Sequence, residues 1–176
     1  AAATHGDILV KNVIPKHLEA TSAKLLEAGC RIEEFDDAVR VSAAGTLHNT
    51  QVTTLPYPGF PTDMQSIFMA LLATTEGTSN VIETVFENRF MHAAELRKMG
   101  ADIRIKGSSS VINGVSHLEA ASVESTDLRA GAAMVIAAQM AKGISEISGL
   151  HHIERGYEGF VEKLEKIGTR IWIADI

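Results

Sequence analysis

Three segments of the chain share one pattern: a helix-like stretch, a glycine, and then a run of residues typical of a β-strand. The segments are Ala23–Ile32, Glu95–Ile103 and Glu162–Ile171, and their glycines, Gly29, Gly100 and Gly168, are 71 and 68 residues apart. Glycine supplies the left-handed backbone that ends a helix, a conformation that other residues adopt only at a cost. A recurring pattern of this kind predicts a fold built from repeated helix–strand units.

A second match lies upstream of the later two segments. Thr62-Asp63-Met64 begins a helix-like stretch that ends near Gly77, and Thr126-Asp127-Leu128 begins one that ends near Gly143. The first unit has only the corresponding glycine, Gly6, which lies 23 residues before Gly29. Gly77 likewise lies 23 residues before Gly100. We therefore expect the first unit to lack its opening helix.

The whole chain, 1–176, is interpreted as a single, partial lobe. Its expected units are approximately 1–54 (truncated), 55–125 and 126–176. On this interpretation the chain begins inside a unit and lacks one of three equivalent helices. The two such helices that are present, 62–75 and 126–141, are apolar on nearly every side, which is typical of helices buried on several faces.

Two other helices, over Phe90–Met99 and Gly156–Ile167, carry Glu and Lys on one face and are expected to cover the outside. β-Branched runs predict strands at Ile8–Val13, Arg31–Phe35, Val39–Val41, Gln51–Thr54, Ser79–Val85, Asp102–Lys106, Ser110–Ile112, Leu118–Val123, Ile144–Ile147 and Thr169–Ile173. The order of these elements predicts an α/β fold (α+β in some schemes) with mixed sheets around central helices.

Composition excludes several classes of function. The chain has 22 acidic residues against 16 Lys and Arg, and a formal net charge of −6, which argues against a general nucleic-acid binder or a basic membrane-surface protein. The longest apolar run, Ala130–Ala141, is too short to span a bilayer. One cysteine, Cys30, excludes an intrachain disulfide and is predicted to be a buried thiol. His151 and His152 have no accompanying ligands, so we expect no metal site.

Two aspartates, Asp63 and Asp127, open the apolar helices. An Asp in the first turn commonly caps a helix through the unpaired N–H groups, and this structural role is the more frequent one for any single residue. Thr62 with Gln65 three residues later also has the spacing of a capping box. For Asp63, however, the turn-rich stretch 57–61 fixes where the helix begins. A carboxylate in such partly desolvated surroundings can act as a general base.

Arginines occur at equivalent places in two units. Arg89 lies 12 residues after Gly77, and Arg155 lies 12 residues after Gly143. Arg129 adds a third guanidinium at the start of the second apolar helix. Each of them singly fits a surface ion pair. Together they can converge on an anion, because the planar guanidinium suits phosphate or carboxylate.

Four motifs at consistent spacing carry a family resemblance. They are Pro58–Gln65, Glu83–His92, Ser125–Ala130 and His152–Glu158. With them the chain resembles, along nearly its whole length, the UDP-N-acetylglucosamine 1-carboxyvinyltransferases of peptidoglycan synthesis. That resemblance implies a two-lobed cytoplasmic enzyme in which each lobe is an inside-out α/β barrel of three βαβαββ units with central helices. It implies transfer of an enolpyruvyl group from phosphoenolpyruvate to the 3-hydroxyl of UDP-N-acetylglucosamine, with release of phosphate.

The resemblance also assigns roles to single residues. The family's carboxylate that contacts and deprotonates the 3-hydroxyl falls on Asp63, and its second aspartate, near the reacting carbon, falls on Asp127. A backbone contact to the uridine nucleotide falls on Val85. The arginine that binds phosphoenolpyruvate falls on Arg155, with Arg129 and Arg89 lining the same cleft.

The chain departs from the family in what it lacks. The family's nucleophilic Cys, and the Lys and Arg that hold phosphoenolpyruvate from the other side, belong to a second lobe, and Cys30 aligns with none of them. We therefore expect the chain alone to be inactive, to need the complementary lobe as partner, and to use no cofactor. Two alternatives stay open: a 3-phosphoshikimate 1-carboxyvinyltransferase-like enzyme, and a binding or scaffold domain that has kept the fold.

Overall fold

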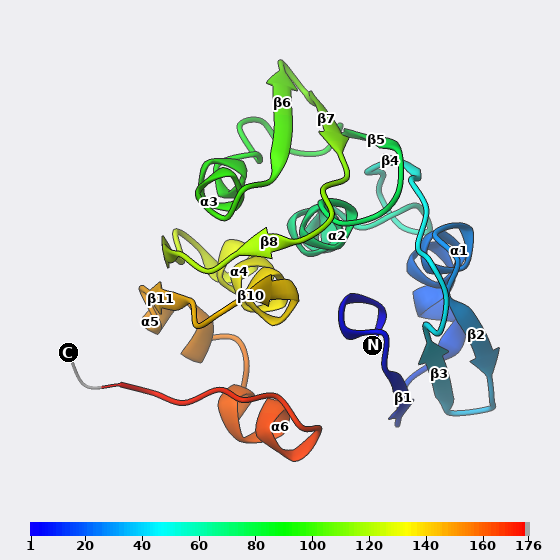
Figure 1. The fold of residues 1–176 in the computed structure, drawn as a ribbon. Coiled ribbons are helices and arrows are strands. Elements are labelled where there is room, and N and C mark those ends of the chain that lie inside the picture. The colour runs from blue at the N-terminus through cyan, green and yellow to red at the C-terminus, as the bar shows by residue number, and fades with distance from the viewer. Residues whose placement is uncertain (175–176) are drawn as a thin grey trace.

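A computed structural model describes residues 1–174 of the chain (Figure 1). The helices are α1 (Glu19–Glu27), α2 (Gln65–Leu72), α3 (His92–Lys98), α4 (Leu128–Met140), α5 (His151–Glu154) and α6 (Phe160–Lys166), with 3-10 turns η1 (Ala2–Thr4), η2 (Pro15–Leu18) and η3 (Thr62–Met64). The strands are β1 (Asp7–Lys11), β2 (Arg31–Glu34), β3 (Ala38–Ser42), β4 (Gln51–Thr53), β5 (Thr78–Ile82), β6 (Asp102–Lys106), β7 (Ser109–Asn113), β8 (Leu118–Glu119), β9 (Ser122–Glu124), β10 (Ala141–Lys142) and β11 (Glu146–Ser148).

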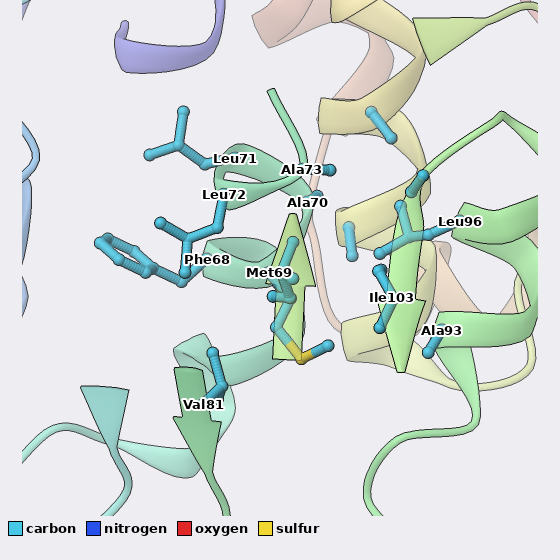
Figure 2. Close-up of a cluster of buried hydrophobic side chains, with 14 of the residues drawn as sticks. Phe68, Met69, Ala70, Leu71, Leu72, Ala73, Val81, Ala93, Leu96 and Ile103 are labelled. Carbon is cyan, nitrogen blue, oxygen red and sulfur yellow. The ribbon is translucent and has the colours of Figure 1, made fainter. Parts of the chain in front are cut away.

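The two helices at the centre, α2 and α4, pack against each other, and the sheets lie outside them (Figure 1). Seven residues of α2 and seven of α4 are buried, as expected for helices that are apolar all round. Met69 and Leu72 of α2 are fully buried, in one cluster with Val81 of β5 and Leu96 of α3, and Figure 2 shows Met69 between Leu72 and Leu96. The predicted arrangement of central helices with outer sheets is confirmed.

Near its first residues the chain forms the short turn η1, which packs against α4. That one of three equivalent helices is missing stays a prediction. His5, which ends η1, takes the left-handed conformation (φ 51°), whereas Gly6 does not. The left-handed position of the first unit is therefore one residue earlier than the repeat predicts.

The largest sheet is mixed, as predicted. Its strand order is β4-β5-β7-β6, with β4 parallel to β5 and the other pairs antiparallel. Strands β1, β3 and β2 form an antiparallel sheet, and two parallel pairs, β8–β10 and β9–β11, complete the outer layer. Helix α3 packs against α4, β6 and β9, and it buries Ala93 and Leu96 in the core.

The repeated glycines end their helices as predicted. Gly29, Gly100 and Gly168 have φ values of 104°, 89° and 97°, which lie in the left-handed region that favours glycine. Each follows a helix and makes the chain turn back along the outside of the lobe. After Gly29 and Gly100 the next element is a strand, but residues 169–174 form no strand, so the strand predicted at Thr169–Ile173 is wrong within the part that the structure describes.

Three other predicted elements differ in detail. The strand expected over Ser79–Val85 ends at Ile82, because the side chain of Glu83 binds the backbone that follows it. The run Leu118–Val123 is broken into β8 and β9. The run Ile144–Ile147 is replaced by β10 and β11, with Gly143 at φ 107° between them.

The capping box predicted at the start of α2 is wrong. The helix is entered through the turn η3, with no side-chain hydrogen bond at its cap. The hydroxyl of Thr62 donates to Glu83 instead, at 2.8 Å. Gln65 is fully buried, and neither polar atom of its side chain has a hydrogen-bond partner among the described residues.

No helix within residues 1–174 is both long enough and apolar enough to cross a membrane.

Candidate active site

The site is centred on the carboxylate of Asp63, which lies in the turn η3 at the entrance to α2. Arg129 Nε, from the first turn of α4, donates to Asp63 Oδ1 at 2.6 Å. Arg89 Nη2, from the loop between β5 and α3, donates to the same oxygen at 3.0 Å. The structure thus brings together three of the residues that the sequence singled out, from segments that are far apart along the chain.

The two guanidiniums determine the charge state of Asp63. Its pKa is lowered from the usual value, chiefly by the hydrogen bond from Arg129 and against an opposing effect of burial, with smaller contributions from the charges of Arg129 and Arg89. The side chain is 59% exposed, so the desolvated carboxylate that the apolar helix suggested is not found. Asp63 is therefore an ionised carboxylate paired with cations. One of its oxygens, Oδ2, accepts no hydrogen bond from the described residues.

The loop after β5 places Arg89. The Phe86 ring lies under the guanidinium of Arg89, with 4.8 Å from Cζ to the ring centroid, which is a cation–π distance. Val85 is partly exposed in the same loop. Its backbone N–H donates to Glu83 Oε1 at 2.8 Å, so only the carbonyl of Val85 can accept from a ligand.

Asp127 serves as the N-cap of α4. Its Oδ1 accepts from the backbone N–H groups of Arg129 at 2.7 Å and Ala130 at 3.1 Å. The capping interpretation of this residue is confirmed. Only one carboxyl oxygen is engaged, because Oδ2 accepts no hydrogen bond within residues 1–174. Asp127 can therefore cap the helix and still present an oxygen at the same end of α4 as Arg129.

Arg155 is the third arginine of the predicted anion site, and it does not join the other two. It ends α5 as an exposed side chain that forms no ion pair or hydrogen bond with the rest of the described chain. Its neighbour Gly156 lies against Leu128 at the start of α4, where an added Cβ would come within 2.6 Å of Leu128 Cδ1. Arg155 therefore belongs to the same end of α4 as Asp127, but only Arg89 and Arg129 converge on Asp63.

Three residues of the site were not assigned a role from the sequence. Tyr157 lies near the Asp63–Arg129 pair: burial raises the pKa of its phenol, the charge of Arg129 opposes this, and that of Asp63 adds to it. Glu83 and His92 are buried under the loop that carries Arg89. The signal that could have found them is their place inside the motifs Glu83–His92 and His152–Glu158.

The remaining candidates behave as expected of structural residues. Cys30 is buried, and burial raises the pKa of its thiol, which disfavours a nucleophilic thiolate. The rings of His151 and His152 lie close together, with centroids 4.0 Å apart and planes tilted by 39°. Across residues 1–174, no three His, Cys, Asp or Glu side chains are grouped so that they could hold a metal ion.

Known proteins with similar sequences decide the family. The family model described as EPSP synthase (3-phosphoshikimate 1-carboxyvinyltransferase) matches residues 1–164. A UDP-N-acetylglucosamine 1-carboxyvinyltransferase of Desulfofundulus thermocisternus is 53% identical over 174 residues, which cover 99% of this chain and 72% of that protein. The chain belongs to the UDP-N-acetylglucosamine 1-carboxyvinyltransferase branch of the EPSP synthase family. The predicted family is thereby confirmed.

Two further similar proteins are longer than this chain. UDP-N-acetylglucosamine 1-carboxyvinyltransferase 3 of Caldanaerobacter subterraneus subsp. tengcongensis is 52% identical, over 97% of this chain but only 41% of its own length. The crystal structure of the enolpyruvyl transferase NikO from Streptomyces tendae superposes with a TM-score of 0.85 at 26% identity, covering 95% of this chain and 41% of that one. The chain thus spans about two-fifths of the length of these two relatives.

Proposed function

We propose that the chain is one lobe of an enzyme that transfers an enolpyruvyl group from phosphoenolpyruvate to the 3-hydroxyl of UDP-N-acetylglucosamine. Phosphate is released, and the reaction is the first committed step of peptidoglycan synthesis. The observation that carries the proposal is the ionised carboxylate of Asp63 between the guanidiniums of Arg89 and Arg129. Such a site offers a proton acceptor beside positive charge, which suits a hydroxyl that must attack an anionic substrate.

The reaction has two steps in this proposal. The oxygen of the 3-hydroxyl bonds to C2 of phosphoenolpyruvate and gives up its proton, while the C3 methylene takes a proton. The resulting tetrahedral adduct then loses phosphate from C2 and a proton from C3, which restores the double bond. Asp63 Oδ2 accepts the hydroxyl proton, since Oδ1 is held by both arginines.

The other side chains have complementary roles. Arg155 binds phosphoenolpyruvate, because its guanidinium is exposed and has no partner in the described chain. Arg129 and Arg89 stabilise negative charge in the same cleft. Asp127, near the reacting carbon, assists proton transfer at the methylene through its unengaged oxygen. The carbonyl of Val85 contacts the nucleotide sugar, since its N–H is already bonded to Glu83.

The chain needs a partner for this activity. We propose that the complementary lobe of the same protein supplies the Cys, Lys and Arg that close the site from the other side, and that the isolated chain does not turn over. A cytoplasmic location fits the two proposed substrates, which are cytoplasmic metabolites. No metal or organic cofactor enters the proposed steps.

Phosphate release from the two substrates tests the proposal. The chain is assayed alone and together with the complementary lobe, with turnover expected only from the combination. Robust turnover by the chain alone would refute the dependence on a second lobe. No turnover by the two-lobed protein would refute the proposed reaction.

Asp63→Asn tests the proposed base. We expect phosphate release to fall by about 100-fold or more, because a positioned general base contributes 10²–10⁴-fold. Stability should change little, since an exposed ion pair contributes about 1 kcal/mol or less. Asp102→Asn is the matched control: this carboxylate also accepts a side-chain hydrogen bond at 2.8 Å, from Asn113, but it lies in β6, outside the site. A large drop in melting temperature with normal turnover per folded molecule would instead support a purely structural Asp63.

The description of the matched family model favours one alternative, the transfer to shikimate 3-phosphate. Titration of the two-lobed protein with UDP-N-acetylglucosamine and with shikimate 3-phosphate separates the two. We expect tight binding of the nucleotide sugar only, and preferential binding of shikimate 3-phosphate would overturn the assignment.

A further inference from the structure

A buried carboxylate lies beneath the site without any cation beside it. Glu83 directly follows β5 and is 3% exposed. Its oxygens accept hydrogen bonds from neutral hydroxyl and backbone N–H groups, and these donors are the leading causes that lower its pKa. Burial of an uncompensated charge is strongly unfavourable, so the donors around this carboxylate are what allow it to stay ionised.

Four donors surround the carboxylate. Oε1 accepts from the hydroxyl of Thr54 at 2.8 Å and from the backbone N–H groups of Val85 at 2.8 Å and Phe86 at 3.1 Å. Oε2 accepts from the hydroxyl of Thr62 at 2.8 Å. These bonds lower the pKa of Glu83, although burial acts in the opposite direction. Both oxygens accept from the protein's own donors and the side chain is buried, so Glu83 is not placed to contact a substrate.

The donors come from three separate segments, and two of these segments carry the candidate site. Thr62 is the residue directly before Asp63. Phe86 provides the ring under Arg89, and Arg89 in turn donates to Asp63. The side chain of Glu83 therefore forms hydrogen bonds both to the turn that carries Asp63 and to the loop that carries Arg89.

We propose that Glu83 is a positioning residue, which holds the Asp63 turn at a fixed separation from the loop of Val85 and Arg89. The inference rests on the proposed function, because the two segments would grip the nucleotide sugar at two points: Val85 by its backbone carbonyl and Asp63 at the hydroxyl. Without these hydrogen bonds of Glu83, the substrate 3-hydroxyl is no longer held close to the carboxylate of Asp63. Even a small misplacement of reacting groups lowers turnover steeply.

Thr62→Val in the two-lobed protein tests the hydrogen bond between Thr62 and Glu83, next to Asp63. The substitution removes one hydroxyl and keeps the volume. We expect the KM for UDP-N-acetylglucosamine to rise and kcat to fall, together by about tenfold in kcat/KM, with the KM for phosphoenolpyruvate nearly unchanged. The melting temperature also falls, because a buried carboxylate loses a donor, so turnover is expressed per folded molecule. Thr62→Ser keeps the donor and should restore most of the loss.

A matched control removes a similar hydroxyl at the opposite end of β5, the strand that Glu83 directly follows. Thr78 begins β5 and donates to Asn113 Oδ1 at 2.8 Å, the same length as the Thr62–Glu83 bond. Thr78→Val should leave both kinetic constants at their wild-type values. If it lowers kcat/KM as much as Thr62→Val does, the effect is general to the sheet and the positioning role is wrong.

A second readout does not depend on activity. In Glu83→Gln the amide oxygen can still accept from Val85 and Phe86, but the NH₂ group cannot accept from Thr62, whose hydroxyl must turn round. We expect the backbone ¹⁵N–H resonances of Val85, Phe86 and Asp63 to shift together in NMR spectra, with those of β6 unchanged.

The outcomes separate the two hypotheses. If the wild-type protein releases phosphate but Thr62→Val keeps its kcat and KM, the positioning role is refuted and the function stands. If Thr62→Ser is as impaired as Thr62→Val, or if Thr62→Val has normal turnover per folded molecule and loses only stability, the role is structural and the inference is also refuted. If the wild-type protein releases no phosphate, the proposed function fails. In that case the NMR readout still tests the inference. If the Asp63 resonance does not shift in Glu83→Gln, Glu83 does not couple the Asp63 turn to the loop of Val85 and Arg89.

Discussion

Asp127 is the residue for which a structural role and a chemical role compete most directly. Its carboxylate caps α4 through two backbone N–H groups, and the family resemblance places the same carboxylate near the reacting carbon. Two substitutions separate these roles. Asp127→Asn keeps an oxygen that can cap the helix but removes the charge, whereas Asp127→Ala removes both.

The structure sets the size of the stability effects. Replacing an Asp cap by Ala costs about 1 kcal/mol, and loss of a negative charge at a helix N-terminus adds about 0.5 kcal/mol. We therefore expect Asp127→Ala to lose about 1.5 kcal/mol of unfolding free energy and Asp127→Asn about 0.5 kcal/mol. For a chain of this size each kcal/mol corresponds to about 2–4 °C in melting temperature, so the shifts are about 3–6 °C and 1–2 °C.

Turnover should not separate the two variants in the way that stability does. If Asp127 assists proton transfer, Asp127→Asn loses about 100-fold in phosphate release despite its small effect on stability, and Asp127→Ala loses at least as much. Thermal unfolding and steady-state phosphate release by the two-lobed protein are measured for both variants. Equal melting temperatures of the two variants would refute the capping argument. Normal turnover of Asp127→Asn would refute the chemical role and leave the cap alone.

Two further predictions concern His92 and Arg155. Burial lowers the pKa of His92 to about 4, beside the sulfur of Met69 at 3.4 Å. The imidazole of His92 thus stays neutral in the folded protein, whereas in the unfolded chain it takes up a proton below about pH 6.5. The free energy of unfolding therefore falls by about 3 kcal/mol as the pH drops from above about 6.5 toward 4. Urea unfolding should show this slope in the wild type and a flatter one in His92→Leu, and equal slopes would contradict it. Arg155→Ala should raise the KM for phosphoenolpyruvate by about tenfold or more without changing the melting temperature, because this exposed side chain has no partner in the described chain; an unchanged KM would contradict its role.

The sequence was most informative about the fold where local chemistry decides the structure. Gly29, Gly100 and Gly168 all take the left-handed conformation that their place in the repeat predicts. The central position of α2 and α4 followed from their apolar character on all sides. These features are set within a few turns of the chain, so they are visible without knowledge of its tertiary contacts.

Errors arose where a distant side chain replaced a local contact. Thr62 has the sequence context of a helix cap, yet its hydroxyl donates to Glu83, which is 21 residues away. The same carboxylate ends β5 earlier than its β-branched residues suggest, because it binds the backbone N–H groups that a longer strand would have used. The strand predicted at Thr169–Ile173 failed for a related reason, since a strand needs a neighbour to pair with and none of the described residues provides one.

The convergence at Asp63 is likewise a property of the folded chain. Spacing placed Arg89 in a loop equivalent to that of Arg155, and Arg129 at the start of the second apolar helix. It gave no distance from either Arg89 or Arg129 to the carboxylate. The present arrangement has a chemical consequence: the guanidiniums that lower the pKa of Asp63 are those proposed to meet the anionic substrate. Each guanidinium uses one N–H on Asp63, Nη2 of Arg89 and Nε of Arg129, so its other N–H groups can donate to an anion, whose negative charge then offsets the effect of the guanidiniums on Asp63. In the proposed reaction, the pKa of the carboxylate therefore rises toward its ordinary value when phosphoenolpyruvate binds, and Asp63 becomes a stronger base. The proposed base thus stays weak until the second reactant is in place.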